Sequence, residues 1–144
     1  MDTEIGALEG FIKEFCAIKK LPSQTDDLFE SLEIYGDDAD EFMVDFGQRF
    51  GVDVSEYRWY FHTGEEISFN PGAWFFKPPN KRVSYIPISF QTLQAAIAKR
   101  MWPIAYPPHE LPKVRWDIRI TQAITLILIA IPIVGFVIAA TTSP

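Results

Sequence analysis

The sequence predicts a mainly α-helical protein, in which a small helical domain precedes one C-terminal transmembrane helix. Three observations predict this class. Apolar residues recur at helical spacing in three separate stretches before residue 102. Glycine and proline interrupt the aromatic stretch from residue 64 to residue 87. Residues 120–142 carry no charged side chain. A chain of 144 residues therefore has room for one modest soluble domain and one such helix.

The first helix is predicted from Glu4 to Lys19, with Pro22 just beyond its end. One face is apolar and carries Ile5, Leu8, Phe11, Ile12 and Phe15. A linker follows from Gln24 to Leu32, with a short helical turn started by Thr25 or Asp26. That turn is expected to bury Leu28, Phe29 and Leu32.

The second main helix is acidic and carries capping signals at both ends. Asp37 or Asp38 is predicted to cap its start, with Glu41 completing a capping box from Asp38, and Gly51 supplies the stop. The helix therefore has one buried face and one anionic face, and its apolar stripe consists of Ala39, Phe42, Met43, Phe46 and Phe50.

The stretch from about residue 57 to residue 88 is predicted to be an ordered loop insertion. Its prolines and glycines exclude a long helix, and its many aromatic residues argue against disorder. It is either wholly irregular or carries a short strand or strand pair, with residues 82–86 as the candidate. Ser89 is then predicted to cap a last soluble helix that runs to about Met101.

The uncharged stretch 120–142 is long enough to span a bilayer, and the alternative is a buried core helix. Lys113, Arg115 and Arg119 precede it, so the positive-inside rule places the N-terminal domain in the cytoplasm. No cleavable signal is evident at the start of the chain. We therefore expect a tail-anchored, single-pass protein of a bacterial inner membrane. Its predicted parts are a soluble domain over 1–112, a basic juxtamembrane linker over 113–119 and the span over 120–142.

Charge is unevenly distributed along the chain. Residues 26–56 hold eleven carboxylates and a single cation, Arg49, whereas residues 57–119 are net basic. The acidic half argues against nucleic acid as a partner and suggests a basic protein surface, while the basic half suits anionic lipid headgroups. The alternative for the acidic half is a solvated face that serves solubility.

Few residues indicate chemistry. His62, Glu65 and Glu66 form the only arrangement that looks like a metal site, and it lacks a second histidine at the necessary spacing. The lone Cys16 is interpreted as a small packed residue. No nucleotide-binding or nucleophile motif is present, so the sequence predicts no enzymatic activity, no cofactor and no metal.

Residues 30–42 resemble the segment of acyl carrier proteins that leads into their second helix. Leu32, Asp38, Glu41 and Phe42 match that pattern, but Gly36 stands where the serine bearing 4′-phosphopantetheine would be. Carrier proteins use this acidic helix to dock partners, so the resemblance implies a protein-binding face. That face consists of Asp37, Asp38, Asp40, Glu41 and Asp45.

Residues 34–42, 50–54, 58–66 and 106–112 are together similar to a bacterial family of acyl-carrier-like proteins known as the domain of unknown function 1493 family. The resemblance covers most of residues 1–119. It implies a small helical fold and no established activity, and it makes His62, Glu65 and Glu66 a possible ligand site.

The leading hypothesis is a membrane-anchored, non-enzymatic interaction module that lacks the phosphopantetheine arm. The first alternative is a functional carrier with its arm on Ser31, or on Ser55, that serves a lipid-modifying enzyme at the membrane. Two further alternatives are an enzyme built on His62, Glu65 and Glu66, and a small effector-like or immunity-like protein that binds another membrane protein.

Overall fold

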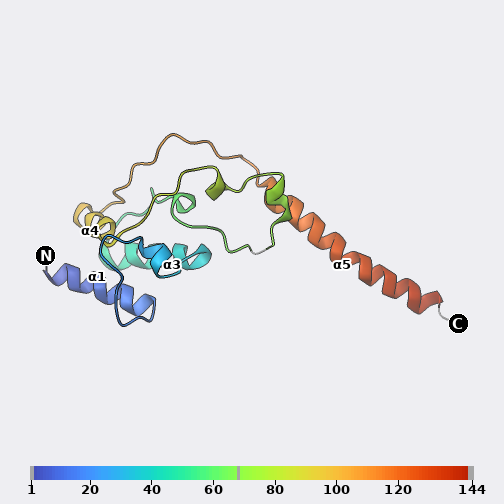
Figure 1. Cartoon of the computed structure of the whole chain (residues 1–144), viewed down its shortest axis with the longest axis horizontal. Coiled ribbons are helices and arrows are strands. Elements are labelled where there is room, and N and C mark those ends of the chain that lie inside the picture. The colour runs from blue at the N-terminus through green and yellow to red at the C-terminus, as the bar shows by residue number, and fades with distance from the viewer. Residues whose placement is uncertain (1, 68, 143–144) are drawn as a thin grey trace. The chain divides into compact units, whose positions relative to one another are not determined.

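The computed structural model describes residues 2–67 and 69–142, and it is mainly helical. The longest helices of the described residues, labelled in Figure 1, are α1 (Asp2–Phe15), α3 (Gly36–Phe50), α4 (Phe90–Lys99) and α5 (Trp116–Thr142). Shorter elements connect them: α2 (Leu28–Ser31) and the 3₁₀ turns η1 (Trp59–Phe61), η2 (Pro71–Trp74) and η3 (Pro79–Lys81). The predicted helical class with one long apolar C-terminal helix is confirmed.

The chain packs as two units. Unit 1 comprises residues 1–66 and 83–109, and unit 2 comprises residues 67–82 and 110–144. Residues 69–82, which are part of the predicted loop insertion, pack in the same unit as α5. The boundaries predicted after residues 112 and 119 separate the soluble domain, the juxtamembrane linker and the span by function, and they stay a prediction.

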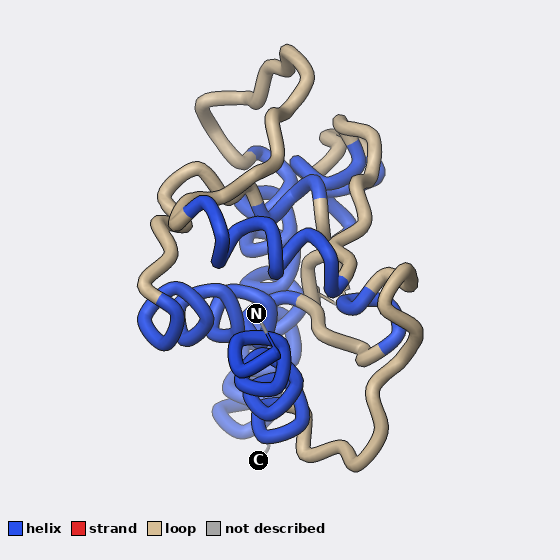
Figure 2. The backbone as a smooth tube through the Cα atoms, turned by 90° about the vertical axis from the view of Figure 1, so that its left-hand side faces the viewer, coloured by secondary structure: helices blue, strands red, loops and turns tan. Residues whose placement is uncertain are grey.

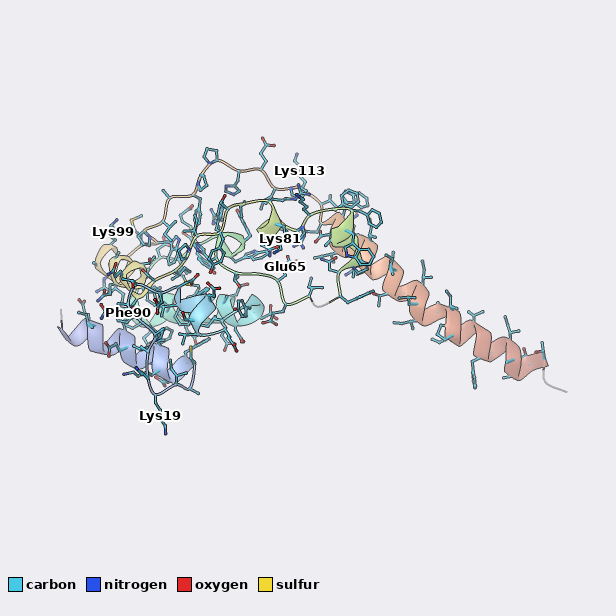
Figure 3. All side chains as sticks on the ribbon, in the orientation of Figure 1. Lys19, Glu65, Lys81, Phe90, Lys99 and Lys113 are labelled. Atoms are coloured by element: carbon cyan, nitrogen blue, oxygen red, sulfur yellow. The ribbon has the colours of Figure 1, made fainter. Side chains whose placement is uncertain are left out.

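Unit 1 is built around a core of phenylalanine rings between α1 and α3. The Phe11 ring lies 5.1 Å from that of Phe42 and 5.7 Å from that of Phe50, centroid to centroid. Phe90, labelled in Figure 3, adds the first residue of α4 to the same buried cluster. The helical spacing of apolar residues in the sequence thus produced the three faces that meet here, as expected for amphipathic helices.

Helix ends differ from several predictions. α1 ends at Phe15 rather than at Lys19, because Ala17 adopts a left-handed conformation with φ of 53°. Asp27, and neither Thr25 nor Asp26, caps α2. The predicted Ser89 cap of α4 is confirmed, and Thr92 completes its capping box.

Residues 82–86 form no strand, and in the described part of the chain Figure 2 shows only helices and loops. The segment has no partner strand with which to form a ladder. Ile86 donates one backbone hydrogen bond, to the carbonyl of Phe61 at 2.7 Å. The described chain has one isolated bridge, between Asp53 and Met101, which ties the end of α3 to the end of α4.

α5 is the only described helix long and apolar enough to cross a membrane, and the apolar window within it is 0% buried. A core helix of a soluble protein would pass the same length test but would be mostly buried. The helix begins at Trp116, four residues before the predicted start of the span at Ile120.

Candidate functional site

α3 turns its carboxylates to solvent. Its buried side chains are Ala39, Phe42, Met43 and Phe46, and at 100° per residue the opposite side of the helix is centred on Asp37, Glu41 and Val44. Asp40 lies on one flank of this line, and Asp38 and Asp45 lie on the other. We call this surface the acidic face, and its five exposed carboxylates are Asp37, Asp38, Asp40, Glu41 and Asp45.

The carboxylates of the acidic face are uncompensated. Among the described residues none of the five forms an ion pair, and the only cation in the last turn of the helix, Arg49, pairs with Glu14 of α1 at 3.3 Å. Partial burial, and then the nearby charge of Asp37, raises the pKa of Asp40. Asp37 and Asp40 thus repel each other, and a basic partner would relieve that repulsion.

The predicted cap at the start of α3 is wrong. Tyr35 occupies the N-cap position without a side-chain hydrogen bond, and Asp37 and Asp38 already lie in the first turn. The helix begins earlier because the carbonyl of Tyr35 accepts the N–H groups of Asp38 and Ala39, at 3.1 and 3.4 Å. Gly36 at its first position takes φ of 50°, a conformation that glycine adopts without steric cost. The two aspartates still lie at the positive end of the helix dipole.

Gly36, which the resemblance to carrier proteins aligns with their serine, is closely covered. Its N–H donates to the carbonyl of Gly64 at 3.3 Å. A Cβ atom at this position would lie 2.4 Å from Cγ of Glu66. A serine side chain here would therefore require Glu66 to move.

A pocket of about 250 Å³ opens beside the start of α3. Glu30, Tyr35 and Tyr85 line it, together with Thr63, Gly64 and the edge of His62. Tyr35 and Tyr85 are both exposed, and Glu30 ends in solvent. The pocket thus combines two aromatic rings with one carboxylate, a combination that suits a cationic side chain.

Tyr85 is held in place by the cap of α2. Its hydroxyl donates to Oδ2 of Asp27, while Oδ1 of the same carboxylate accepts the N–H of Phe29 at 3.1 Å. Burial, followed by the hydrogen bond and charge of Asp27, raises the pKa of Tyr85. The tyrosine therefore stays neutral. Its ring is held in one position and lines the pocket.

His62 lies behind this pocket and is 1% exposed. The Tyr106 hydroxyl accepts the N–H of Arg58 at 3.1 Å and the indole N–H of Trp102 at 2.7 Å. Both lone pairs of that oxygen are then used, so its proton goes to Nε2 of His62 at 2.8 Å. Nδ1–H of His62 donates to the carbonyl of Ile86 at 2.6 Å. Both ring nitrogens are thus engaged within the fold.

The other candidate residues lie in different surroundings. Glu65, labelled in Figure 3, is half-buried, and Glu66 is exposed beside Gly36. Across the described residues, no three His, Cys, Asp or Glu side chains gather as a metal site. A ligand role for His62, Glu65 and Glu66 stays a prediction.

The alternative attachment sites are both exposed serines. Ser31 is the last residue of α2, and Ser55 follows Asp53, whose carboxylate accepts the Ser55 N–H at 2.9 Å. Neither lies at the start of a long helix, where the carrier pattern places its serine.

Sequence reasoning missed Tyr35, Tyr85 and Glu30 as pocket residues. Tyr85 is 58 positions from Asp27, the residue that orients it, and nothing local in the sequence indicates the pairing. Tyr35 and Glu30 flank the acidic helix, and their nearness to it was the only available signal.

No family model, curated protein or solved structure matches this chain.

Proposed function

We propose that this chain is a membrane-anchored, acyl-carrier-like interaction module that docks a basic protein surface through the acidic face of α3. It acts without enzymatic activity and without a phosphopantetheine arm. One observation supports this above all. The five carboxylates of the acidic face are exposed on one side of a single helix, and none is paired within the described chain.

Electrostatics favours such a role. Clustered like charges destabilise the isolated protein by self-repulsion, and a basic partner turns that repulsion into attraction. The same field speeds association with a cationic surface, in a way that salt weakens. A helix kept only for solubility would gain as much from carboxylates dispersed over the surface.

The pocket beside Tyr35 indicates which side chain the partner surface would present. Its volume of about 250 Å³ lies below the range of about 300–1,000 Å³ typical of small-molecule sites. A single lysine or arginine side chain fits that size, with its charge toward Glu30 and its stem against the rings of Tyr35 and Tyr85. The partner surface would then be basic, with one protruding cation.

Membrane attachment is assigned to α5, because it is apolar and solvent-exposed along its apolar window. The cations Lys113, Arg115 and Arg119 at its start support a cytoplasmic, inner-membrane placement of unit 1 under the positive-inside rule.

The test is crosslinked capture from native membranes, with the full chain as bait and intact-mass analysis of that bait. Replacing Asp37, Asp38, Asp40 and Glu41 with lysine should weaken binding to the captured protein at least about tenfold, or about 1.4 kcal/mol. A matched control reverses four exposed carboxylates elsewhere: Glu4, Asp26, Glu33 and Glu110.

The control changes the net charge equally, so it should bind within about twofold of the wild type if the acidic face is the site. Equal losses of binding in both variants would show that total charge, and not the acidic face, determines binding. A bait heavier by one phosphopantetheine would overturn the proposal and favour the carrier with its arm on Ser31.

A further inference from the structure

Unit 2 contains a polar lock that holds η2 against the first turns of α5. The Thr121 hydroxyl donates to Oδ1 of Asn70 at 2.7 Å and accepts the N–H of Gly72 at 3.0 Å. One turn earlier, Asp117 is 2% exposed and receives Nε and Nη2 of Arg115 at 2.9 and 2.6 Å. Nδ2 of Asn70 also points to this carboxylate, at 3.5 Å.

Gly72 brings the two backbones into direct contact. A Cβ atom at this position would lie 1.9 Å from the backbone oxygen of Asp117. That neighbour is main chain in a helix, so it cannot move aside as a flexible side chain would. The segment 69–76 is therefore fixed to the start of α5, so the position of α5 also determines the position of this segment.

The locked segment exposes an unusual number of aromatic side chains. Trp74 is 82% exposed and Phe75 is 71% exposed. The Phe76 ring lies 6.5 Å from the Trp116 ring at the start of α5. We call this surface the aromatic patch, and it consists of Phe69, Trp74, Phe75, Phe76 and Trp116.

Exposed aromatic patches mark interaction sites, because a soluble surface gains nothing from them. Cations accompany this one. Unit 2 holds six cations and two carboxylates, a net charge of +4. One of those carboxylates, Asp117, is already neutralised by Arg115. Exposed Lys77, Lys81 and Arg82 directly follow the patch in sequence.

The length of α5 sets the depth of the patch. The predicted span over residues 120–142 rises about 34 Å, enough to cross a hydrocarbon core of about 30 Å. Trp116 then lies about 6 Å further along the axis, at the level of the lipid headgroups. This is the zone where tryptophan is enriched in membrane proteins.

We infer that the aromatic patch is a second membrane contact, which inserts into the bilayer interface beside α5 while its flanking cations bind anionic phospholipid headgroups. The inference rests on the proposed membrane insertion of α5. The ligand of the aromatic patch is the phospholipid of the leaflet that the N-terminal end of α5 enters. The apolar rings would lie at the acyl boundary and the cations among the phosphates.

The test measures depth at three positions in the full chain, each labelled with an environment-sensitive dye on one cysteine in a Cys16→Ala background. Phe75→Cys reports the patch, Leu128→Cys reports the span, and Gln24→Cys in unit 1 is the exposed control. The proteins are reconstituted in vesicles that contain lipids with a nitroxide at a shallow or a deep acyl position.

Position 128 should be quenched most by the deep nitroxide, position 75 most by the shallow one, and position 24 by neither. Adding phosphatidylglycerol to phosphatidylcholine vesicles should increase the shallow quenching at position 75. Quenching at position 128 with none at position 75 would overturn the inference and leave the span intact. No quenching at position 128 would overturn the membrane assignment, and the inference with it.

A further variant tests the lock. Gly72→Ala should reduce the quenching at position 75 toward that at position 24 and leave the quenching at position 128 unchanged, because the added methyl group pushes the segment off α5. Full quenching at position 75 in this variant would contradict the role of the lock.

Discussion

The side chain of His62 illustrates how a residue with apparent chemical potential is used for structure. It is buried, and its hydrogen bonds to Tyr106 and to the carbonyl of Ile86 join the chain segment after α3 to the segments on either side of α4. Burial lowers its pKa to about 4, although the hydrogen bond to Ile86 acts in the opposite direction. The residue is therefore neutral in the folded protein at physiological pH.

This protonation state predicts a pH dependence of unit 1. The unfolded chain binds a proton on His62 near pH 6.5, whereas the folded chain binds it only near pH 4. The free energy of unfolding of unit 1 should therefore be highest above pH 6.5. It should fall by roughly 3 kcal/mol in all as the pH falls toward 4. Hydrogen exchange of core amides in the full chain, measured in nanodiscs across this range, checks it.

The His62→Gln variant should be less stable at pH 7 and should lose most of this dependence. The matched control is His109→Gln, at the exposed second histidine, which leaves His62 in place and should keep the dependence. An identical pH profile in wild type and His62→Gln would contradict the assignment.

At the scale of the element, α3 is bounded by two glycines with positive φ. Gly36 begins the helix with φ of 50°, and Gly51 ends it with φ of 62° while its N–H donates to the carbonyl of Gly47. Between them the helix presents one phenylalanine-rich face to the core and the acidic face to solvent. The first residue of α3, Gly36, therefore lies directly against the Glu66 side chain.

We expect Gly36→Ala to destabilise α3 by about 1 kcal/mol from its positive φ, with an additional cost from the contact with Glu66. Adding Glu66→Ala should recover only the contact contribution. The measurement is a double-mutant cycle on opening free energies from hydrogen exchange of α3 amides. Gly51→Ala, at the other positive-φ glycine, is the matched variant with no link to Glu66. Additive effects at positions 36 and 66 would show that Glu66 does not cover the start of α3.

At the scale of the molecule, the two packing units carry net charges of opposite sign. Unit 1 carries a net charge of −10 and unit 2 carries +4, which together give the chain's −6. The proposed protein-binding face and the proposed lipid-binding patch thus lie in units of opposite sign. Each unit would attract its own class of partner and repel the other class.

The placement of unit 1 in the cytoplasm can be tested by cysteine accessibility. In a Cys16→Ala background, Ser84→Cys should react with a membrane-impermeant maleimide only after the inner membrane of bacterial spheroplasts is opened. Thr142→Cys, at the far end of α5, is the matched control and should react in intact spheroplasts. The reverse pattern would invert the topology. Release of the chain by alkaline carbonate would exclude a spanning helix.

Sequence periodicity predicted most of the helical framework. The apolar stripe of α3, the Ser89 cap of α4 and the glycine stop at Gly51 all appear where the residues indicated them. These features are local, since each depends on residues within a turn or two of one another. The predicted Asp37 or Asp38 cap was wrong because it depended on the backbone of Gly36, which residue type alone does not fix.

By itself, the sequence determined a helical protein with one acidic amphipathic helix and one long apolar helix, because composition and period decide which faces can be buried. The tertiary structure decided what lies together. It placed Tyr85 beside the cap of α2, engaged both nitrogens of His62, and joined residues 69–76 to α5 through Asn70, Gly72 and Thr121. These contacts join residues 24 to 58 positions apart, and long-range packing of that kind leaves no periodic signal in the chain.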